Sequence, residues 1–462
     1  MNVRGSNSPV NVSQIIEESN NKRFSVNLIA WTFLLMILEG FDVASISFVA
    51  PILMENWQIA SGSFGLVFGV GTFGLMLGGF LFGYLGDKIG RKKALMFSTV
   101  IFSIFTLLTI FSNSLPTLIA LRFLVGLGLG GTVPLCIVLV NEFAPKKAKG
   151  RWVAIMFTGF PLGMSAGGMI AAQLLENFDW HSIFLVGGIA PLIALFGVFF
   201  KLPESLRFLV INNKNRREIA NLVTKLKPEL KIYPTTEYTV DQVDQAVSFT
   251  PKLLFSKSLR FVTPLIWIAS ITSSFVVYFL NSWMPKLLVS SGLTLTDAAM
   301  TTSLYHLAGI LAGPIVGWIF DRYGLLACVV FPISGSILTA ILGFPMTGAL
   351  LMLAVFSAGF FVIGTQGIMT ASTPNFYPTA YRANGNGIAM GIAKIGSISG
   401  PIIGGILIAQ LSLNRLFFVN SGIIAFAVIL FTLLGILSVK LFAERKMIED
   451  EDTTEGPIEI SH

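Results

Sequence analysis

Two carboxylates, Glu39 and Asp42, stand three residues apart in the mostly apolar stretch LLMILEGFDVASISFVAPIL, residues 34–53. Residues at this spacing share one face of a helix, so both acids can point the same way. Placing an ionisable group within a membrane-spanning helix costs about 2.5 to 3.5 kcal/mol, and such groups are functional candidates by default. We therefore predict that these two acids take up and release protons.

Three further ionisable residues lie inside apolar segments: Arg122, His306 and Lys394. Arg122 lies only a few residues inside its segment, at a depth comparable to that of Asp42. His306 is a candidate proton relay because its ring titrates near neutral pH, although a single histidine can equally be a neutral polar residue. Lys394, near the middle of its segment, is a candidate partner for an organic anion; the alternative is a lysine whose ammonium reaches the membrane surface.

Aromatic and amide side chains could contact the ring of such an anion. Phe160, Tyr278 and Trp283 are candidates for stacking on a ring, and Asn281 could hydrogen-bond a ring substituent. Helix capping or helix packing explains Asn281 equally well. Most of the 40 phenylalanines are expected to pack between helices or to face lipid.

The composition of the whole chain indicates a membrane protein. Of its 462 residues 54% are hydrophobic and 12% are charged, whereas soluble domains carry about one quarter charged residues. Spaced glycines, such as Gly74/Gly78, Gly79/Gly83 and Gly126/Gly130, let helices approach closely in lipid. A membrane span needs about 20 mostly apolar residues. The sequence predicts twelve, over residues 24–49, 63–85, 94–112, 115–140, 151–175, 181–201, 260–284, 297–320, 325–343, 347–373, 385–410 and 415–440.

The spans divide into two groups of six. We expect a tail over residues 1–23, a first six-helix bundle over 24–202, a central loop over 203–258, a second bundle over 259–441 and a tail over 442–462. All but four of the 31 Lys and Arg residues lie at or beyond span ends on one side. By the positive-inside rule, both termini and the central loop face the cytoplasm of a multi-pass protein of the cell (inner or plasma) membrane. The basic charge is thus a topology signal and does not favour nucleic acid as a partner.

The central loop contains NNKNRREIANLVTKLK, residues 212–227. Its apolar residues recur at helical spacing between basic ones. This pattern predicts a short amphipathic helix that lies on the inner membrane surface.

Two short motifs recur at a nearly constant offset. GYLGDKIG at 83–90 matches GWIFDRYG at 317–324, which is 234 residues later, and GMSAG at 163–167 matches GSISG at 396–400, which is 233 residues later. Two homologous halves explain both matches. Parallel repeats of six spans, related by an axis along the membrane normal, are typical of a transporter fold that binds its substrate at mid-depth between the halves.

The loop GYLGDKIGRKK at 83–93 and PESLRF at 203–208 resemble the major facilitator superfamily, and the resemblance covers nearly the whole chain. Five motifs are similar to the aromatic acid:proton symporter group within it: EGFD at 39–42, RFLVGLGLGG at 122–131, GFPLG at 159–163, FLVGGIAPL at 184–192 and YPTAYRANG at 377–385. That group usually has aspartate where this chain has Glu39, and arginine where it has Lys394. A lysine lacks the two-pronged guanidinium that suits a carboxylate.

The resemblance implies an all-α integral membrane fold of twelve transmembrane helices in two pseudo-symmetric six-helix bundles. In that fold the helices carrying Asp42 and Arg122 are neighbours, so we expect an ion pair between them; its simpler role would be to offset the cost of two buried charges. The resemblance also implies a charge cluster at the span ends that closes the inner side of the molecule. Its expected members are Asp87, Arg91 and Glu142, and more loosely Arg151, Asp321 and Arg322.

The expected function is proton-coupled symport of a small organic carboxylate, benzoate-like or hydroxybenzoate-like, by alternating access. A proton on Glu39 or Asp42 would loosen the hold on Arg122, and the substrate carboxylate would bind Lys394 or Arg122. We expect no cofactor other than protons, no bound metal and a monomer. The alternatives are a proton-coupled carrier of a sugar, nicotinate or a dicarboxylate, and a receptor with a transporter fold. We expect no enzyme, since the sequence shows no nucleophile–base set, metal-ligand spacing or phosphate-binding loop.

Overall fold

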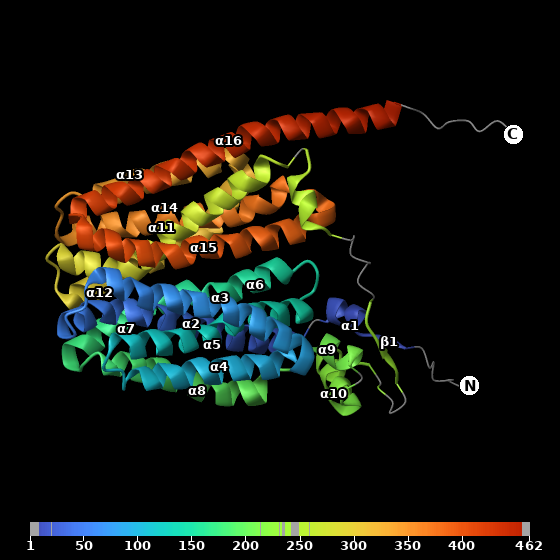
Figure 1. The fold of residues 1–462 in the computed structure, drawn as a ribbon. Helices are drawn as coiled ribbons and strands as arrows, with labels where there is room; N and C mark the ends of the chain where they lie inside the picture. The colour runs from blue at the N-terminus through green and yellow to red at the C-terminus, as the bar shows by residue number, and fades with distance from the viewer. Residues whose placement is uncertain are drawn as a thin grey trace, which may run out of the picture. The chain divides into compact units, whose positions relative to one another are not determined.

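The computed structural model is almost entirely helical, and it describes residues 9–19, 21–212, 214–230, 232, 236–241, 249–257 and 259–454 (Figure 1). Within these residues eleven apolar stretches of helix are long enough to cross a membrane, and α13 (Ala327–Ile341) is a shorter apolar helix. The twelve correspond to the twelve predicted spans, and they confirm the all-α membrane class. The long ones are α2 (Lys22–Asn56), α3 (Ser61–Ile89), α4 (Arg91–Thr109), α5 (Leu115–Phe143), α6 with α7 (Lys149–Phe157 and Gly159–Asn177), α8 (His181–Lys201), α11 (Val262–Ser290), α12 (Leu295–Tyr323), α14 (Gly348–Ser372), α15 (Arg382–Gln410) and α16 (Leu413–Thr454).

The ninth and twelfth spans differ in length from the prediction. The ninth, expected over 325–343, consists of the 3-10 turn η2 (Gly324–Leu326) and the 15-residue helix α13. Helix α16 passes the predicted end of the twelfth span near residue 440 and continues to Thr454. Further short 3-10 turns are η1 (Pro251–Phe255), η3 (Thr373–Phe376) and η4 (Thr379–Tyr381).

By its contacts the chain forms two compact units. Unit 1 comprises residues 1–245, 281–310 and 401–410, and unit 2 comprises residues 246–280, 311–400 and 411–462. The C-terminal end of α11, the first half of α12 and the end of α15 therefore belong to unit 1. The predicted division into two bundles at 203–258 does not coincide with these units, and it stays a prediction.

In unit 1, α3 and α5 cross through their glycines. A Cβ on Gly74 or Gly78 of α3 would lie 2.3 or 2.1 Å from a carbonyl oxygen of α5. A Cβ on Gly126 or Gly130 of α5 would lie 2.0 or 2.1 Å from a carbonyl oxygen of α3. Gly83 takes no part, since a Cβ there would meet nothing within 4 Å. Backbone contact of this kind is how small residues join helices in lipid.

Glycines also fix the helix that carries the two acids. A Cβ on Gly40 in α2 would lie 2.0 Å from the carbonyl oxygen of Phe160 in α7, and a Cβ on Gly163 in α7 would lie 2.0 Å from that of Ile37 in α2. Gly40 stands between Glu39 and Asp42 in the sequence. The α2–α7 crossing therefore sets the direction in which each acid points.

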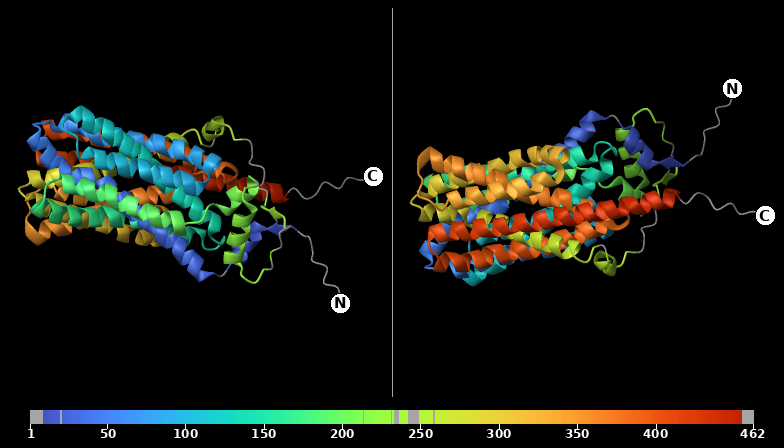
Figure 2. Two further views of the ribbon diagram at one scale, coloured as in Figure 1. Left: turned by 90° about the horizontal axis from the view of Figure 1, so that it is seen from below. Right: turned by 90° about the horizontal axis from the view of Figure 1, so that it is seen from above.

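A small subdomain packs on one end of the unit 1 helices (Figures 1 and 2). We call it the loop cap; it consists of β1 (Val10–Asn11), α1 (Val12–Glu18), α9 (Leu206–Ile211), α10 (Arg216–Leu226) and β2 (Tyr238–Thr239). The two short strands pair in parallel, Val10 with Tyr238 and Asn11 with Thr239. The loop cap thus joins the start of the described chain to its central loop.

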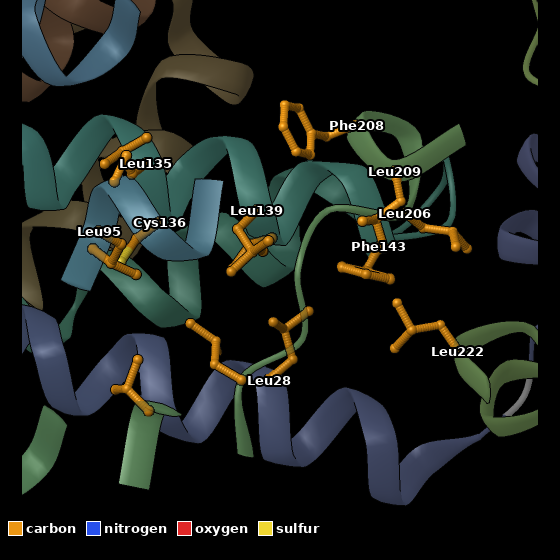
Figure 3. Packing of buried hydrophobic residues seen from close by; sticks show 14 of the residues in the cluster. Leu28, Leu95, Leu135, Cys136, Leu139, Phe143, Leu206, Phe208, Leu209 and Leu222 are labelled. Carbon is orange, nitrogen blue, oxygen red and sulfur yellow. The ribbon is translucent and has the colours of Figure 1, made fainter. Parts of the chain in front are cut away.

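The predicted amphipathic helix of the central loop exists as α10, but its predicted place on the membrane surface is wrong. Its apolar residues, among them Leu222, are buried in one cluster with Ile15 of α1, Leu206 of α9 and Phe143 of α5. Figure 3 shows Leu222, Leu206 and Phe143 in this cluster. The helix uses its apolar face against the protein itself, so no apolar face is left for lipid.

Unit 2 has its own apolar core. Helix α13 packs between α14 and α16, and Phe331 of α13 lies in a cluster with Ile368 of α14 and Phe431 of α16. Gly364 of α14 leaves room for the Phe331 ring, because a Cβ there would lie 2.8 Å from it. This core holds the helices that carry Lys394 and its neighbours.

Candidate functional site

Asp42 and Arg122 form a buried pair in unit 1. Nη1 of Arg122 lies 3.9 Å from Oδ2 of Asp42, and the side chains are 4% and 0% exposed. Thr106 of α4 donates a 2.7 Å hydrogen bond to Oδ1 of Asp42. The predicted ion pair is therefore present, with a short bond from a hydroxyl on one carboxylate oxygen and the guanidinium at longer range from the other.

Arg122 has two further contacts within unit 1. Its Nη2 donates a 3.0 Å hydrogen bond to Oγ1 of Thr109, and its guanidinium stacks over the Phe184 ring at 5.0 Å. A buried charge needs such partners, because removing one member of a buried pair leaves an uncompensated ion. The contacts keep Arg122 in place while leaving Oδ2 of Asp42 without a hydrogen bond in the described structure. That oxygen is where a proton would be accepted.

Glu39 and His306 are also buried in unit 1, each 1% exposed. Glu39 lies three residues before Asp42 on α2, as predicted. His306 lies on α12 beside Tyr305, and its Nε2 has no hydrogen-bond partner among the described residues. No hydrogen bond or ion pair of the described chain joins His306 to Asp42 or Arg122, so its part in a proton path stays a prediction.

A polar pocket in unit 2 surrounds Lys394. We call it the Lys394 pocket, and helices α11, α14 and α15 supply its wall. Among the described residues that line it none is acidic, and Lys394 is its one formal charge. Its lining residues are Ser270, Ser273, Ser274, Tyr278, Gln366, Met369, Thr370, Thr373, Asn386, Ala389, Met390, Ala393, Lys394 and Ser397. A cation among hydroxyl and amide groups is suited to an organic anion with further polar substituents.

Several of these lining residues did not stand out in the sequence. Asn386, Met390, Lys394 and Ser397 follow one another on α15 at spacings of three and four, which place them on one helix face. Serines of α11 and Gln366 of α14 complete the wall. Polar residues at helical spacing around the one charged residue were the available signal.

Of the predicted ring contacts, only Tyr278 lines the Lys394 pocket. Phe160 stacks on Phe157, with ring centroids 6.0 Å apart. Trp283 is fully buried in unit 1, where its Nε1 donates a 2.9 Å hydrogen bond to the Pro401 carbonyl oxygen. That bond occupies the one N–H of Trp283, so this side chain has no donor left for a ligand. Asn281 is half-buried, and its Oδ1 has no partner in the described structure.

The charge cluster expected at the span ends is present in part. Arg91 lies 2.7 Å from Asp87 and 3.4 Å from Glu142, which brings together the three principal members. Glu204, which the sequence reading missed, accepts a 3.1 Å bond from the Lys92 N–H at the start of α4. Its signal was the PESLRF motif.

The looser members of this cluster have no such contacts. Arg151 and Asp321 are exposed, and neither takes part in an ion pair within the residues that the structure describes. Arg322 in unit 2 lies over the rings of Trp318 and Tyr323, at 5.7 Å from each. The gating role of the whole cluster stays a prediction.

Comparisons with known proteins agree with this architecture. The profile of the Major Facilitator Superfamily matches residues 32–392 and 266–451. The chain is 33% identical over 424 residues to the gallate transporter of Pseudomonas putida, covering 91% of this chain and 93% of that one. It is 33% identical over 409 residues to the 4-hydroxybenzoate transporter PcaK of Acinetobacter baylyi, covering 87% and 89%. The crystal structure of a bacterial homologue of the human lysosomal transporter Spinster, inward-facing and occupied, superposes with a TM-score of 0.68 at 14% identity, covering 91% of this chain and 98% of that one.

Proposed function

Because this chain belongs to the Major Facilitator Superfamily, we propose that it imports a small aromatic carboxylate together with protons. The observation that carries the proposal is Lys394, a cation in a pocket of unit 2 that no acidic residue lines among those described. A carboxylate would pair with its ammonium, and hydroxyl groups of α11 and α15 would supply further hydrogen bonds. The relatives named as transporters of gallate and of 4-hydroxybenzoate support this substrate class.

Proton coupling is assigned to the buried charges of unit 1. Protonation of Asp42 would neutralise one member of its pair with Arg122 and so weaken the hold of α2 on α5. Glu39, one turn earlier on the same helix, would share the titration, because two nearby acids titrate as a coupled pair. A carrier that moves only when both proton and substrate have bound would then couple the two flows by alternating access.

The proposal places the protein in the cell inner membrane as a single chain. Its support is the distribution of Lys and Arg, which puts both termini on the cytoplasmic side by the positive-inside rule. The loop cap and the Arg91 cluster would then face the cytoplasm. Reaction of single cysteines in the two tails with a membrane-impermeant reagent, in intact and opened cells, tests this orientation.

Uptake into proteoliposomes tests the function. With an imposed pH gradient, alkaline inside, we expect 4-hydroxybenzoate to accumulate above its equilibrium level. Imposing the membrane voltage separately measures net charge movement, since each elementary charge contributes about 2.3 kcal/mol per 100 mV. Accumulation that ignores the pH gradient would refute proton symport.

Variants of Lys394 test the site. Lys394→Ala is expected to abolish high-affinity uptake, while Lys394→Arg keeps it, because a guanidinium also binds a carboxylate. Lys286→Ala, which removes a cation of α11 outside the pocket, is the matched control and should transport normally. Unchanged substrate affinity in Lys394→Ala would point to an uncharged substrate such as a sugar.

A further inference from the structure

We propose that the Lys394 pocket selects aromatic carboxylates whose ring carries hydroxyl groups over the unsubstituted ring, and that Asn386 and Gln366 determine this selectivity. This rests on the function proposed above and names its substrate more narrowly. The argument is one of donors and acceptors in a pocket whose polar groups outnumber what a carboxylate can use.

A carboxylate uses only the donors of the pocket. It accepts hydrogen bonds and donates none. Lys394 supplies an ammonium, and Ser273, 6% exposed, has a hydroxyl with no hydrogen-bond partner in the described structure. These two groups match the acceptor oxygens of a carboxylate. They leave the amide side chains of the pocket without a use.

The two amides of the pocket present groups that a carboxylate does not satisfy. Oδ1 of Asn386 is buried and accepts no hydrogen bond among the described residues, and the amide nitrogen lies 3.7 Å from the sulfur of Met390. The amide nitrogen of Gln366 donates to Oγ of Ser274 at 3.4 Å, so its oxygen is the part of the group open to a ligand. A hydroxyl both donates and accepts, and it therefore pairs with an amide in either orientation.

The spacing along α15 fits one ring between the two ends. Asn386 and Lys394 are eight residues apart, which is a rise of about 12 Å along a helix. A benzene ring with a carboxylate and an opposite hydroxyl, and a hydrogen bond of about 2.8 Å at each end, covers a comparable length. Gln366 approaches from α14, where it would meet a second hydroxyl on the neighbouring ring carbon.

The remaining polar residues of the pocket do not compete for these groups. Thr370 and Thr373 donate to carbonyl oxygens of their own turn, at 3.0 and 2.7 Å, and Ser397 does the same at 3.4 Å. A bare ring in this pocket would leave both amides facing C–H groups. Sites built to bond a hydroxyl reject the analogue without it, because their own polar groups are then left unpaired.

Binding to the purified full-length protein tests the proposal. Calorimetric titration with benzoate, 4-hydroxybenzoate and 3,4-dihydroxybenzoate should give an order of affinity that rises with the number of hydroxyls. Benzoate is expected to bind at least about tenfold more weakly than 3,4-dihydroxybenzoate. Asn386→Leu should remove most of the advantage of 4-hydroxybenzoate over benzoate, and Gln366→Leu that of the second hydroxyl. Asn177→Leu, which removes an exposed amide at the end of α7, should leave the order unchanged.

The outcomes separate this proposal from the function on which it rests. Equal affinity for benzoate and the hydroxylated acids would overturn the selectivity while leaving carboxylate transport intact. An equal loss of affinity for all three ligands in Asn386→Leu and Gln366→Leu would show that the amides only support the fold. Binding of none of the three acids by the unaltered protein would instead refute the proposed function.

Discussion

Gly163 of α7 lies so close to the backbone of Ile37 in α2 that a Cβ on it would be 2.0 Å from the Ile37 carbonyl oxygen. In unit 2, Gly396 of α15 stands in the same relation to Ile271 of α11, also at 2.0 Å. Ile271 follows Ile37 by 234 residues, and Gly396 follows Gly163 by 233. The repeat seen in the sequence is thus a repeated helix crossing.

This crossing predicts the effect of adding one carbon. Gly163→Ala and Gly396→Ala should each force a helix pair apart and destabilise the protein by about 1 to 3 kcal/mol, the usual cost of overpacking. Thermal unfolding of the purified protein would measure this as a lower Tm. Gly83→Ala is the matched control, because a Cβ there meets nothing within 4 Å. A Tm for Gly163→Ala equal to that of the control would contradict the close crossing.

The repeat also relates the two halves chemically. Counted by the same offset, Ser273 in the Lys394 pocket corresponds to Glu39, and Lys394 corresponds to Pro161 beside Phe160. Equivalent backbone positions thus carry an acid in one half and a hydroxyl in the other. One ancestral helix crossing holds proton-binding chemistry in unit 1 and anion-binding chemistry in unit 2 under the proposed function.

The Asp42–Arg122 pair predicts a non-additive response to mutation. Asp42→Ala leaves a buried guanidinium without its counter-charge and is expected to cost about 3 to 5 kcal/mol of stability. The double variant Asp42→Ala plus Arg122→Met removes both charges and should be less destabilised than Asp42→Ala alone. A double-mutant cycle of unfolding measurements gives the coupling. Strict additivity would show that the 3.9 Å separation carries no interaction.

Part of this picture follows from the sequence because charge in lipid is rare. Membrane spans and the Asp42–Arg122 pair could be predicted, since each rests on an apolar segment or an ion inside one. Asn386 and Gln366 were missed because uncharged polar residues are common in such helices and often bond to their own turn, as Thr365 does to the Phe361 carbonyl oxygen. Only the fold brings them around Lys394.

The loop cap was missed for a different reason. The segment before α2 is polar overall, and the apolar residues in it, such as Val12 and Ile15, are too few to predict a helix that packs on the protein. Helix α10 could be predicted from its spacing, but its apolar face has no partner within its own sequence neighbourhood. The partner lies about 200 residues away in α1, and no local pattern indicates it.

The loop cap should loosen in acid. Its ion pair joins Glu18 of α1 to Lys227 after α10 at 2.5 Å, and the hydrogen bond from Lys227 holds the pKa of Glu18 below its ordinary value. A carboxyl with a lowered pKa stabilises the folded arrangement above its ordinary pKa, near 4.3, and this contribution is lost as the pH falls through the lowered value. Hydrogen exchange of the α1 amides should therefore speed up below about pH 4.

Two variants check the assignment of this acid response. Glu18→Gln and Lys227→Gln should each remove the acid-dependent step in α1 exchange, and the remaining protection should come from Val12 and Ile15. The pair is partly exposed, so the step is expected to be small and to weaken with salt. An acid step that persists unchanged in Glu18→Gln would assign it to another group, such as Glu17, which accepts a 2.8 Å bond from the Lys146 N–H.

Removing the titratable protons of α2 should separate exchange from uphill transport. In Glu39→Gln plus Asp42→Asn both side chains keep their shape, but neither can release a proton. The variant is expected to lose accumulation driven by a pH gradient while still exchanging labelled for unlabelled substrate across the membrane, because exchange needs no net proton movement. Proteoliposome uptake and counterflow measure the two activities side by side. Accumulation at the parental level in this variant would place the coupling proton elsewhere, with His306 as the next residue to test.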